Sequence, residues 1–270
     1  MSLKRSLGVS GPAHEPMDAL PTGPSGALES AWERALAPWT TGSGPLALLF
    51  SGGLDSSFLA WELRGRRGLV LATVGTPQSP DLLDAEEAAR TLRLRWVPAI
   101  VSEADVRAMA AELADTTSHV SSVVRRVLVA FGLAVRHAPA AEVLCGQGAD
   151  ELFLGYAHYR SLDDDALRQR SAEDLARLLG DDWPRSLAIA RRFGKTVHAP
   201  YLDPGFVAAA QAIPVALRAP RPTPKAFLRA WAERRGLPAR LAERPKRALQ
   251  YGTGVDRILR RDEARGASPP

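Results

Sequence analysis

Two stretches of the sequence carry residue types suited to chemistry, and the first of them runs from Ser51 to Ser57. Its adjacent glycines permit backbone conformations that a Cβ forbids, so main-chain N–H groups can come close to a ligand. The stretch also starts a helix, and the unpaired N–H groups and partial positive charge of a helix N-terminus bind anions. An ordinary capped turn has a similar composition. The three Ser hydroxyls beside the Gly pair favour phosphate binding over that alternative.

Asp55 is the acidic residue in this stretch, and it predicts a metal ion. A carboxylate that faces a phosphate is repelled unless a divalent cation such as Mg²⁺ lies between them. The second stretch, 146–156, places two glycines and then Asp150 and Glu151 directly after an apolar run. Taken alone, this acidic pair is equally typical of a helix start. Together with Asp55, Asp150 favours a shared Mg²⁺ whose other ligands are phosphate and water.

The segments around these two stretches alternate between predicted strands and helices. Short apolar runs predict strands at 46–50, 68–74, 95–101 and 142–145. Start signals and apolar spacing predict helices near 28–36, 58–63, 80–92, 103–113, 121–136, 182–193, 204–212 and 225–235. Such alternation predicts an α/β fold with a parallel sheet flanked by helices, and ligands bind beyond the carboxyl ends of its strands. We therefore expect the loops after Phe50, Val74 and Cys145 to meet at one site.

Composition indicates a globular protein that is not specialised for nucleic acid. The chain has 270 residues with 46% hydrophobic content, enough for one large or two small domains. Its 35 basic and 30 acidic residues are interspersed, without stacking aromatics among the basic ones. Cys145 is the one cysteine, which excludes an internal disulfide and fits a cytoplasmic location. We found neither a membrane-spanning apolar run nor a signal core after Lys4-Arg5, and the histidines lack the spacing of zinc ligands.

The motifs resemble those of a known family. The stretch Ser51 to Ser57 resembles the pyrophosphate-binding loop of the N-type ATP pyrophosphatases (PP-loop superfamily), in the form found in the synthetase domain of asparagine synthetase. The segments 146–156, 199–203 and 244–248 are similar to further signatures of that domain, in the same order. The resemblance covers roughly residues 27–260. It implies an adenine nucleotide alpha-hydrolase-like (HUP-type) fold, with the synthetase-like domain at 26–262 and a mostly helical C-terminal portion. The Pro, Gly and Ser content of residues 1–25 predicts a flexible extension, and we expect a flexible tail at 263–270.

The resemblance also implies a two-step reaction that uses ATP and Mg²⁺. ATP activates a carboxylate, with aspartate as the first expectation, and releases pyrophosphate to leave an acyl-adenylate. Ammonia or an amine then attacks to form an amide. Negative charge develops on the leaving pyrophosphate, and hydrogen-bond donors and a cation aimed at that charge lower the barrier.

Residue roles follow from the matched positions. Asp55 and Asp150 are the implied metal ligands and, with Lys246, the implied catalytic residues. Lys246 is expected to contact the phosphates and stabilise the transition state, and Lys225 to be a second phosphate-side lysine, although a surface lysine is an alternative for each, more so for Lys225. Tyr156 is expected to support the site wall. The other implied nucleotide-binding residues are Leu49, Val74 and Gly146 around the adenine, with Ser51, Gly52, Gly53, Leu54, Ser56, Ser57, Gln147 and Glu151.

Departures from the family pattern leave the substrate open. The signature usually has Glu where this chain has Gln147, and an amide cannot act as a general base. Another carboxylate, as in the related β-lactam synthetases, is therefore an alternative acid, and a non-catalytic nucleotide-binding subunit is an alternative from another class. Position 2 is Ser2 rather than a nucleophilic cysteine, so we expect no glutaminase activity and a free or partner-supplied ammonia source. The run 163–165 is expected to be a solvated helix start, and a homodimer is left open.

Overall fold

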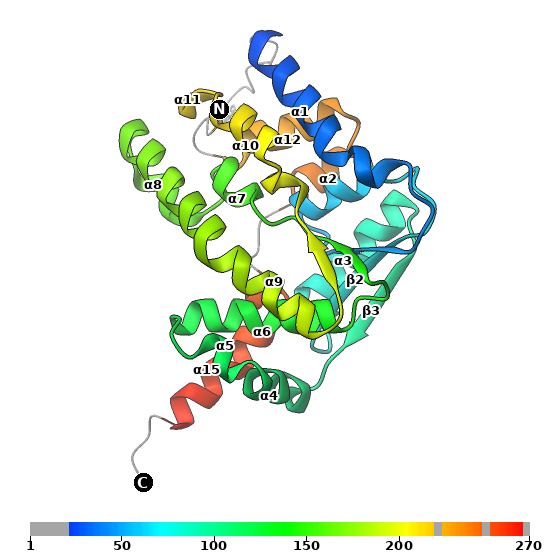
Figure 1. The fold of residues 1–270 in the computed structure, drawn as a ribbon, viewed down its shortest axis with the longest axis vertical. Coiled ribbons are helices and arrows are strands. Elements are labelled where there is room, and N and C mark those ends of the chain that lie inside the picture. The colour runs from blue at the N-terminus through cyan, green and yellow to red at the C-terminus, as the bar shows by residue number, and fades with distance from the viewer. Residues whose placement is uncertain (1–21, 219–222, 245–248, 267–270) are drawn as a thin grey trace, which may run out of the picture.

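The computed structural model describes residues 22–218, 223–244 and 249–266, and it is built around one parallel sheet (Figure 1). Five strands lie in the order β3-β2-β1-β4-β5, and every neighbouring pair is parallel. Their bounds are β1 Leu46–Leu49, β2 Leu69–Gly75, β3 Trp96–Ile100, β4 Glu142–Leu144 and β5 Thr196–His198. The predicted parallel sheet is confirmed, and the four predicted strands lie within one residue of their observed bounds.

β5 is a strand that the sequence did not predict, in a portion of the chain expected to be mostly helical. Only three residues long, it pairs with β4 in the register Glu142↔Thr196 and Leu144↔His198. A run this short carries no recognisable period, so its strand conformation comes from pairing with β4.

The strand order changes direction between β1 and β4. From β1 the chain adds β2 and β3 on one side, and then returns to add β4 and β5 on the other. In open parallel sheets a ligand binds at such a switch point, in the crevice beyond the carboxyl ends of the strands. The segment Ser51–Ser57 follows β1 and the segment 146–156 follows β4, so both stretches border this crevice.

Helices cover both faces of the sheet, and each face has its own apolar core. Side chains alternate along β1, with Leu46 and Leu48 packed on one core and Ala47 and Leu49 on the other. The first core is completed by α1 (Thr22–Thr40), α2 (Leu54–Glu62), α3 (Pro80–Leu92), α10 (Pro204–Gln211), α12 (Ala226–Arg234) and α13 (Ala239–Ala242). The second is completed by α4 (Glu103–Glu112), α6 (Ser122–Arg136), α9 (Trp183–Arg192) and α15 (Val255–Gly266).

The remaining helical elements are short or lie beside the crevice. They are α5 (Ala114–Thr117), α7 (Ala149–Leu152), α8 (Asp164–Arg177), α11 (Val215–Arg218) and α14 (Leu249–Gly252), with 3₁₀ turns at Ala157–Ser161 and Pro200–Leu202 and a π turn at Leu178–Asp182. Asp163 caps α8 by accepting a hydrogen bond from the N–H of Ala166 at 2.8 Å, as expected for the helix start there. Ser102 and Asp105 form a capping box at the start of α4.

An aromatic cluster centred on Trp32 joins α1 to the helices that border the crevice. The Trp32 ring is fully buried and stacks on Phe58 of α2, with ring centroids 5.5 Å apart. It also contacts Tyr201, Phe206 and Trp231 at centroid distances between 4.9 and 5.7 Å. Buried aromatic pairs of this kind add to the stabilisation from burial, so α1, α2, α10 and α12 pack as one layer.

Several observed helix ends differ from the expected boundaries. α2 begins at Leu54, so the prediction that it starts at Phe58 was wrong: Gly53 is the extended N-cap and Ser57 N–H already donates to its carbonyl. α1 begins at Thr22, and α15 continues to Gly266. The boundaries expected at residues 26 and 263 therefore fall inside helices. Ion pairs of Arg125 and Arg126 with Glu263 hold the last turns of α15.

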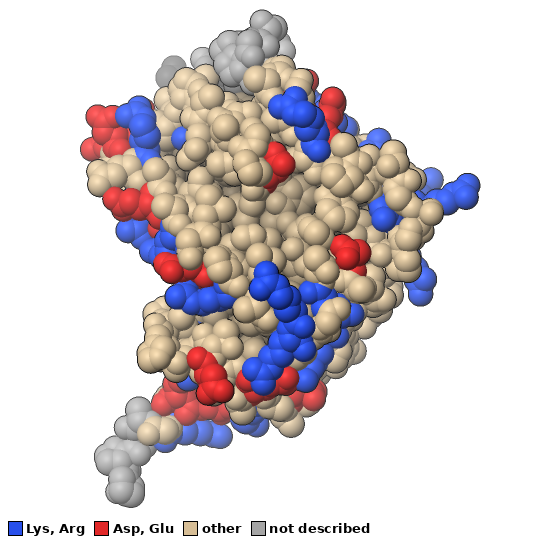
Figure 2. Space-filling view, viewed as in Figure 1, with Lys and Arg blue, Asp and Glu red and all other residues tan. Residues whose placement is uncertain are grey.

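The surface carries both charges side by side. Figure 2 shows basic and acidic side chains interspersed on the face drawn, with a short band of basic side chains across its lower part. Within the described ranges, none of the helices combines the length and apolar content that crossing a bilayer requires.

Candidate active site

The loop after β1 is held in place by its own side chains. Ser51 N–H donates to Ser56 Oγ at 3.3 Å, Gly53 N–H donates to Ser51 Oγ at 3.3 Å, and Ser56 Oγ donates to the Gly53 carbonyl at 3.3 Å. Gly52 has φ +71°, and a Cβ there would lie 2.5 Å from the main-chain oxygen of Asp84. Only glycine fits this close passage of two backbones, so Gly52 has a specific structural reason.

Ser57 has a buried hydroxyl without a hydrogen-bond partner among the described residues. Its side chain lies in the first turn of α2 and has no exposed surface. Buried hydroxyls are almost always hydrogen-bonded, so an unsatisfied one at a helix start indicates a place for an oxygen-rich ligand.

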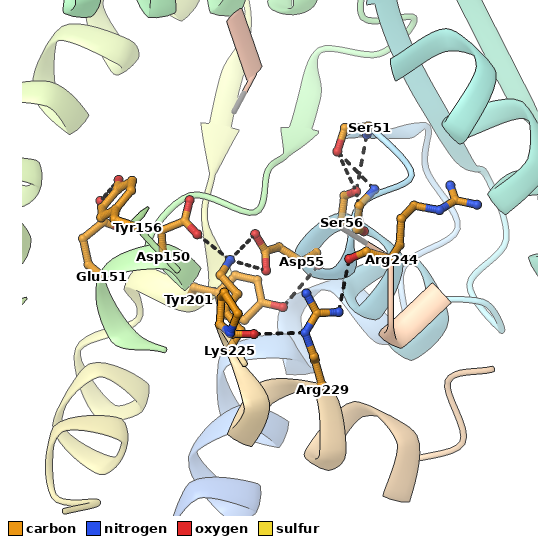
Figure 3. Close-up of polar contacts among 12 residues, drawn as sticks. Ser51, Asp55, Ser56, Asp150, Glu151, Tyr156, Tyr201, Lys225, Arg229 and Arg244 are labelled. Carbon is orange, nitrogen blue, oxygen red and sulfur yellow. Dashed lines mark hydrogen bonds and ion pairs between the residues drawn. The ribbon is translucent and has the colours of Figure 1, made fainter. Parts of the chain in front are cut away.

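Asp55 and Asp150 converge on a single point between the ends of β1 and β4 (Figure 3). That point is occupied by the ammonium of Lys225, whose Nζ is 2.6 Å from both carboxylate oxygens of Asp55 and 2.6 Å from Oδ1 of Asp150. The Lys225 side chain is only 2% exposed, whereas the two aspartates are 25% and 24% exposed. The two carboxylates therefore reach one common cation while remaining open to the crevice.

The burial and the partners of Lys225 bear on the alternative of a surface lysine. A surface lysine is excluded, because the side chain is buried, and the ammonium contacts two carboxylates. Burial by itself lowers the pKa of this ammonium, but Asp150 and Asp55 outweigh burial and the pKa is raised. Lys225 is therefore a positive charge at neutral pH.

Gly155 provides the space for this arrangement. A Cβ at position 155 would overlap the Asp150 carboxylate and the Lys225 side chain. The N–H of Gly155 also donates to the main-chain oxygen of Asp150 at 2.9 Å, which closes the turn after α7. The second glycine-containing stretch is thus shaped around the carboxylate–ammonium contact.

The donor set fits a magnesium ion. Mg²⁺ is usually held by one or two carboxylates together with substrate phosphates and water. Asp55 and Asp150 would hold it, with the loop from Ser51 to Ser57 adjacent for the phosphates, once the Lys225 ammonium has moved away. Among the residues that the structure describes, there is no group of three or more His, Cys, Asp or Glu side chains that could hold a metal by themselves.

Glu151 and Tyr156 form a buried pair beside this site. Tyr156 Oη donates to Glu151 Oε1 at 2.5 Å, and the Glu151 residue is 7% exposed. Burial, followed by the charge of neighbouring Asp150, raises the pKa of the Glu151 carboxyl to about 7. Tyr156 thus braces the acidic stretch after β4 from one side (Figure 3).

Sequence comparison places the chain in a family. The profile of the asparagine synthase family matches residues 27–166 and 159–266. The chain belongs to the asparagine synthase family.

Curated relatives match this chain over different lengths. A curated protein of Methanocaldococcus jannaschii, provisionally named glutamine-hydrolyzing asparagine synthetase 1, is 27% identical over 273 residues, which cover 86% of this chain and 50% of the relative. Asparagine synthetase domain-containing protein 1 of Mus musculus is 32% identical over 130 residues, or 45% of this chain and 21% of that protein. The chain thus spans half the length or less of these curated relatives.

The solved structures that resemble the chain do so weakly. The NMN synthetase from Francisella tularensis has 13% sequence identity and a TM-score of 0.43, with 93% of this chain and 89% of that chain covered. Family membership therefore rests on the sequence match, which confirms the resemblance found in the motifs.

The segment 199–203, the third of the family signatures, contacts the main chain of Asp55. Tyr201 is fully buried, and its hydroxyl donates to the main-chain oxygen of Asp55 at 3.2 Å. Asp203 caps α10 by accepting from the N–H of Phe206 at 3.0 Å. The segment 199–203 therefore contributes positioning rather than an acidic ligand.

Arg244 is a site residue that the sequence analysis did not single out. Its guanidinium donates to the carbonyl oxygens of Gly52 at 3.1 Å and Asp84 at 2.6 Å. Arg229 in turn donates to the carbonyl oxygen of Arg244 at 3.1 Å. Arg244 could have been noticed, since it is the first residue of the last family motif. Its hydrogen-bond acceptors are backbone oxygens, however, and no sequence pattern predicts a contact with a distant backbone atom.

The remaining predicted nucleotide-binding residues take three kinds of position. Leu49 and Val74 lie near the carboxyl ends of β1 and β2 on the same face of the sheet. A Cβ at Gly146 would lie 3.2 Å from Cβ of Asp55, so the loops after β1 and β4 touch.

Gln147 is half-buried in the turn before Gly148, and Leu54 is buried at the start of α2. Lys246, the expected catalytic lysine, lies outside the described residues.

Cys145 directly follows β4, and His198 ends β5. Cys145 is buried at the end of β4, and burial raises the pKa of its thiol to about 12, so the thiol is inert at neutral pH. His198 Nε2 lies 2.8 Å from a carboxylate oxygen of Glu142, and its ring packs on Trp39 with centroids 4.3 Å apart. His198 is thus a partnered histidine at the edge of the sheet.

Proposed function

We propose that this chain is an ATP-dependent ligase that activates a carboxylate as its acyl-adenylate and transfers the acyl group to ammonia or an amine. The observation that carries the proposal is the convergence of Asp55 and Asp150 beside the preformed loop from Ser51 to Ser57. Membership of the asparagine synthase family supports the same class of reaction. A metal–triphosphate site between β1 and β4 is what such chemistry needs.

The residues divide the first step between them. Main-chain N–H groups of the Gly52-Gly53 turn and the first turn of α2, with the free hydroxyl of Ser57, bind the β- and γ-phosphates. Asp55 and Asp150 would hold Mg²⁺, which would neutralise part of the charge that develops on the phosphates. The acid's carboxylate oxygen attacks the α-phosphorus, and the bond to the β-phosphate oxygen breaks. Pyrophosphate leaves with its electron pair, stabilised by these donors and by the cationic side chains of Lys225 and Lys246.

The second step is attack on the acyl carbon. The nitrogen of ammonia or an amine forms the amide bond, AMP leaves, and the nitrogen loses one proton. Gln147 lies where the family usually has Glu, so the proton has to go to a base other than residue 147. With aspartate as the acid and ammonia as the nucleophile, the product is asparagine.

Two alternatives remain within the proposal. Gln147 favours an acid other than aspartate, as in the β-lactam synthetases, because the residue that usually acts as base is missing. The other alternative is a nucleotide-binding subunit without turnover. Retention of Asp55, Asp150 and Lys246 together argues against that alternative, since binding alone has little need of a lysine that stabilises the transition state.

Exchange of labelled pyrophosphate into ATP tests the proposed reaction against both alternatives. The assay is run with Mg²⁺ across a panel of carboxylates that includes aspartate. Exchange with aspartate supports the asparagine-forming reaction, and exchange with another acid alone supports the β-lactam synthetase-like one. Absence of exchange with every acid, from protein that binds ATP, would leave the non-catalytic subunit. Product formation with ammonium or glutamine as donor then identifies the nitrogen source.

A further inference from the structure

The Lys225 ammonium lies at the position that a shared metal ion would take. Nζ is 2.6 Å from three carboxylate oxygens, two of Asp55 and one of Asp150. A metal bound by both aspartates has to approach these same oxygens at about 2.1 Å. Two cations cannot share that space, because the repulsion between unit charges a few ångströms apart is large in a partly buried site. Lysine and metal therefore compete for the same pair of carboxylates.

The fold holds Lys225 in this position at a conformational cost. Its backbone has φ +56° at the N-cap of α12, a left-handed conformation that is uncommon for residues other than glycine. Such strain persists where the surroundings determine the conformation, and it is concentrated at functional sites. Gly155, whose missing side chain leaves room for the Lys225 methylenes, is one of those surroundings. Three segments, after β1, after β4 and before α12, thus combine to place one ammonium.

A displaced ammonium would need a new anionic partner. The Lys225 side chain is 2% exposed, so moving it from the two carboxylates without another anion leaves a nearly buried charge unpaired. The polyphosphate of a nucleotide bound at the adjacent loop supplies that anion. A metal ion that binds without nucleotide supplies no anion, so it would have to displace the ammonium at the cost of leaving that charge buried and unpaired.

We propose that Lys225 is an exchangeable internal cation: it neutralises Asp55 and Asp150 in the nucleotide-free protein and transfers to the phosphates when metal and nucleotide bind together. This inference rests on the proposed function, since it requires a metal–ATP site at the two aspartates. Its consequence is that the metal binds weakly without nucleotide, and that each ligand raises the affinity for the other by the same factor.

Mn²⁺, a paramagnetic substitute for Mg²⁺, allows the test without catalysis. Free Mn²⁺ is measured by electron paramagnetic resonance during titration of the protein, with and without a non-hydrolysable ATP analogue at saturating concentration. For the unmodified chain, we expect the affinity for Mn²⁺ to be roughly 10-fold or more higher with the analogue. Equally tight binding of Mn²⁺ with and without the analogue would overturn the proposal, and this comparison needs no variant.

Lys225→Met removes the charge and keeps most of the side-chain length. We expect it to raise the nucleotide-free affinity for Mn²⁺ roughly 10-fold and to reduce the effect of the analogue. Adding Asp150→Asn to this variant should remove the gain, because one of the two ligands is then neutral. Lys195→Met is the matched control: the Lys195 ammonium donates to the carbonyls of Ala138 and Ala140, away from the site, so its affinity for Mn²⁺ should equal that of the unmodified chain.

Failure of this inference is distinguishable from failure of the proposed function. A folded Lys225→Met variant, verified by circular dichroism, with unchanged affinity for Mn²⁺ would overturn the transfer of the ammonium, whereas pyrophosphate exchange by the unmodified chain would still support the ligase reaction. Coupled binding of Mn²⁺ and analogue without pyrophosphate exchange for any acid would support the internal cation and count against the ligase reaction. Absence of Mn²⁺ binding even with the analogue would overturn both.

Discussion

Arg244 Nη1 donates a hydrogen bond to the main-chain oxygen of Gly52 at 3.1 Å, across a separation of 192 residues in sequence. The same nitrogen donates to the carbonyl oxygen of Asp84, and the guanidinium also pairs with Glu87. The contact joins the last family signature to the loop proposed to bind phosphate. Because Gly52 is held between Asp84 and Arg244, the shape of the loop depends on a residue from the far end of the chain.

Loss of the Arg244 anchor should affect catalysis more than folding. Arg244→Ala leaves two backbone carbonyls without their donor, which costs about 1–3 kcal/mol of stability. Small displacements of binding groups lower rates strongly, so we expect pyrophosphate exchange to fall about 100-fold. Arg244→Lys should restore little, because a single ammonium does not reproduce the planar fork of donors. Denaturant unfolding and the exchange assay measure the two effects.

Glu87→Gln is the control for the Arg244 contact. The Glu87 side chain is 55% exposed, so loss of its ion pair should change stability by less than about 1 kcal/mol and leave exchange unaffected. Exchange at the unmodified rate in Arg244→Ala would contradict the positioning role.

Gly155→Ala should disturb the contact between Lys225 and Asp150. The added methyl group overlaps both side chains, so one of them has to move. Overpacking of this kind costs about 1–3 kcal/mol, and exchange activity should fall with it. Gly180→Ala is the matched control, since a Cβ there meets no atom within 4 Å. Equal unfolding midpoints for the two variants would show that the space at position 155 is not needed.

Glu151 should make the stability of the protein decrease as the pH rises. Its carboxyl has a pKa of about 7 in the folded chain, above the ordinary value of 4.5, so the folded state binds the proton more tightly than the unfolded state. The stability of the folded state is therefore greatest when this group is protonated, and it falls by up to about 3 kcal/mol between pH 4.5 and 7. The measurement is denaturant unfolding at several pH values without nucleotide or divalent metal.

The variant Glu151→Gln isolates this contribution. Gln keeps an oxygen that can accept from Tyr156 Oη and does not titrate. We expect the stability of the unmodified chain to decline relative to that of the variant between pH 4.5 and 7. Parallel pH profiles for the two proteins would contradict the raised pKa.

Lys246→Ala should abolish turnover while ATP binding stays measurable. In the sequence, Lys246 comes after Arg244, which donates to Gly52, and before Thr253, whose carbonyl oxygen accepts from the N–H of Thr76 at 2.9 Å. A lysine that stabilises the transition state acts on rate more than on ground-state binding. Exchange rates and nucleotide titrations separate these effects, with Lys195→Ala as a control outside the site. Unchanged turnover in Lys246→Ala would mean that the role is misassigned.

Local features of the fold could be predicted because their causes are local. The apolar run of β1, the glycines at 52 and 53 and the start of α2 follow one another directly in the sequence, so the loop proposed to bind phosphate could be identified without a structure. β5 was missed, since three residues gain strand conformation only by pairing with β4. The start of α2 was misplaced by four residues because Gly53, rather than a hydroxyl side chain, is its N-cap.

The amino-acid sequence by itself determined the family, the parallel α/β architecture and the two aspartates to be brought together, because these depend on residue types and spacing within short segments. Tertiary structure alone decided that Lys225 lies between Asp55 and Asp150, and that Arg244 binds the backbone of Gly52. Lys225 and Asp55 are 170 residues apart. Whether an ammonium lies in water or between two carboxylates depends on how distant segments pack, and no local pattern encodes that balance of desolvation and charge.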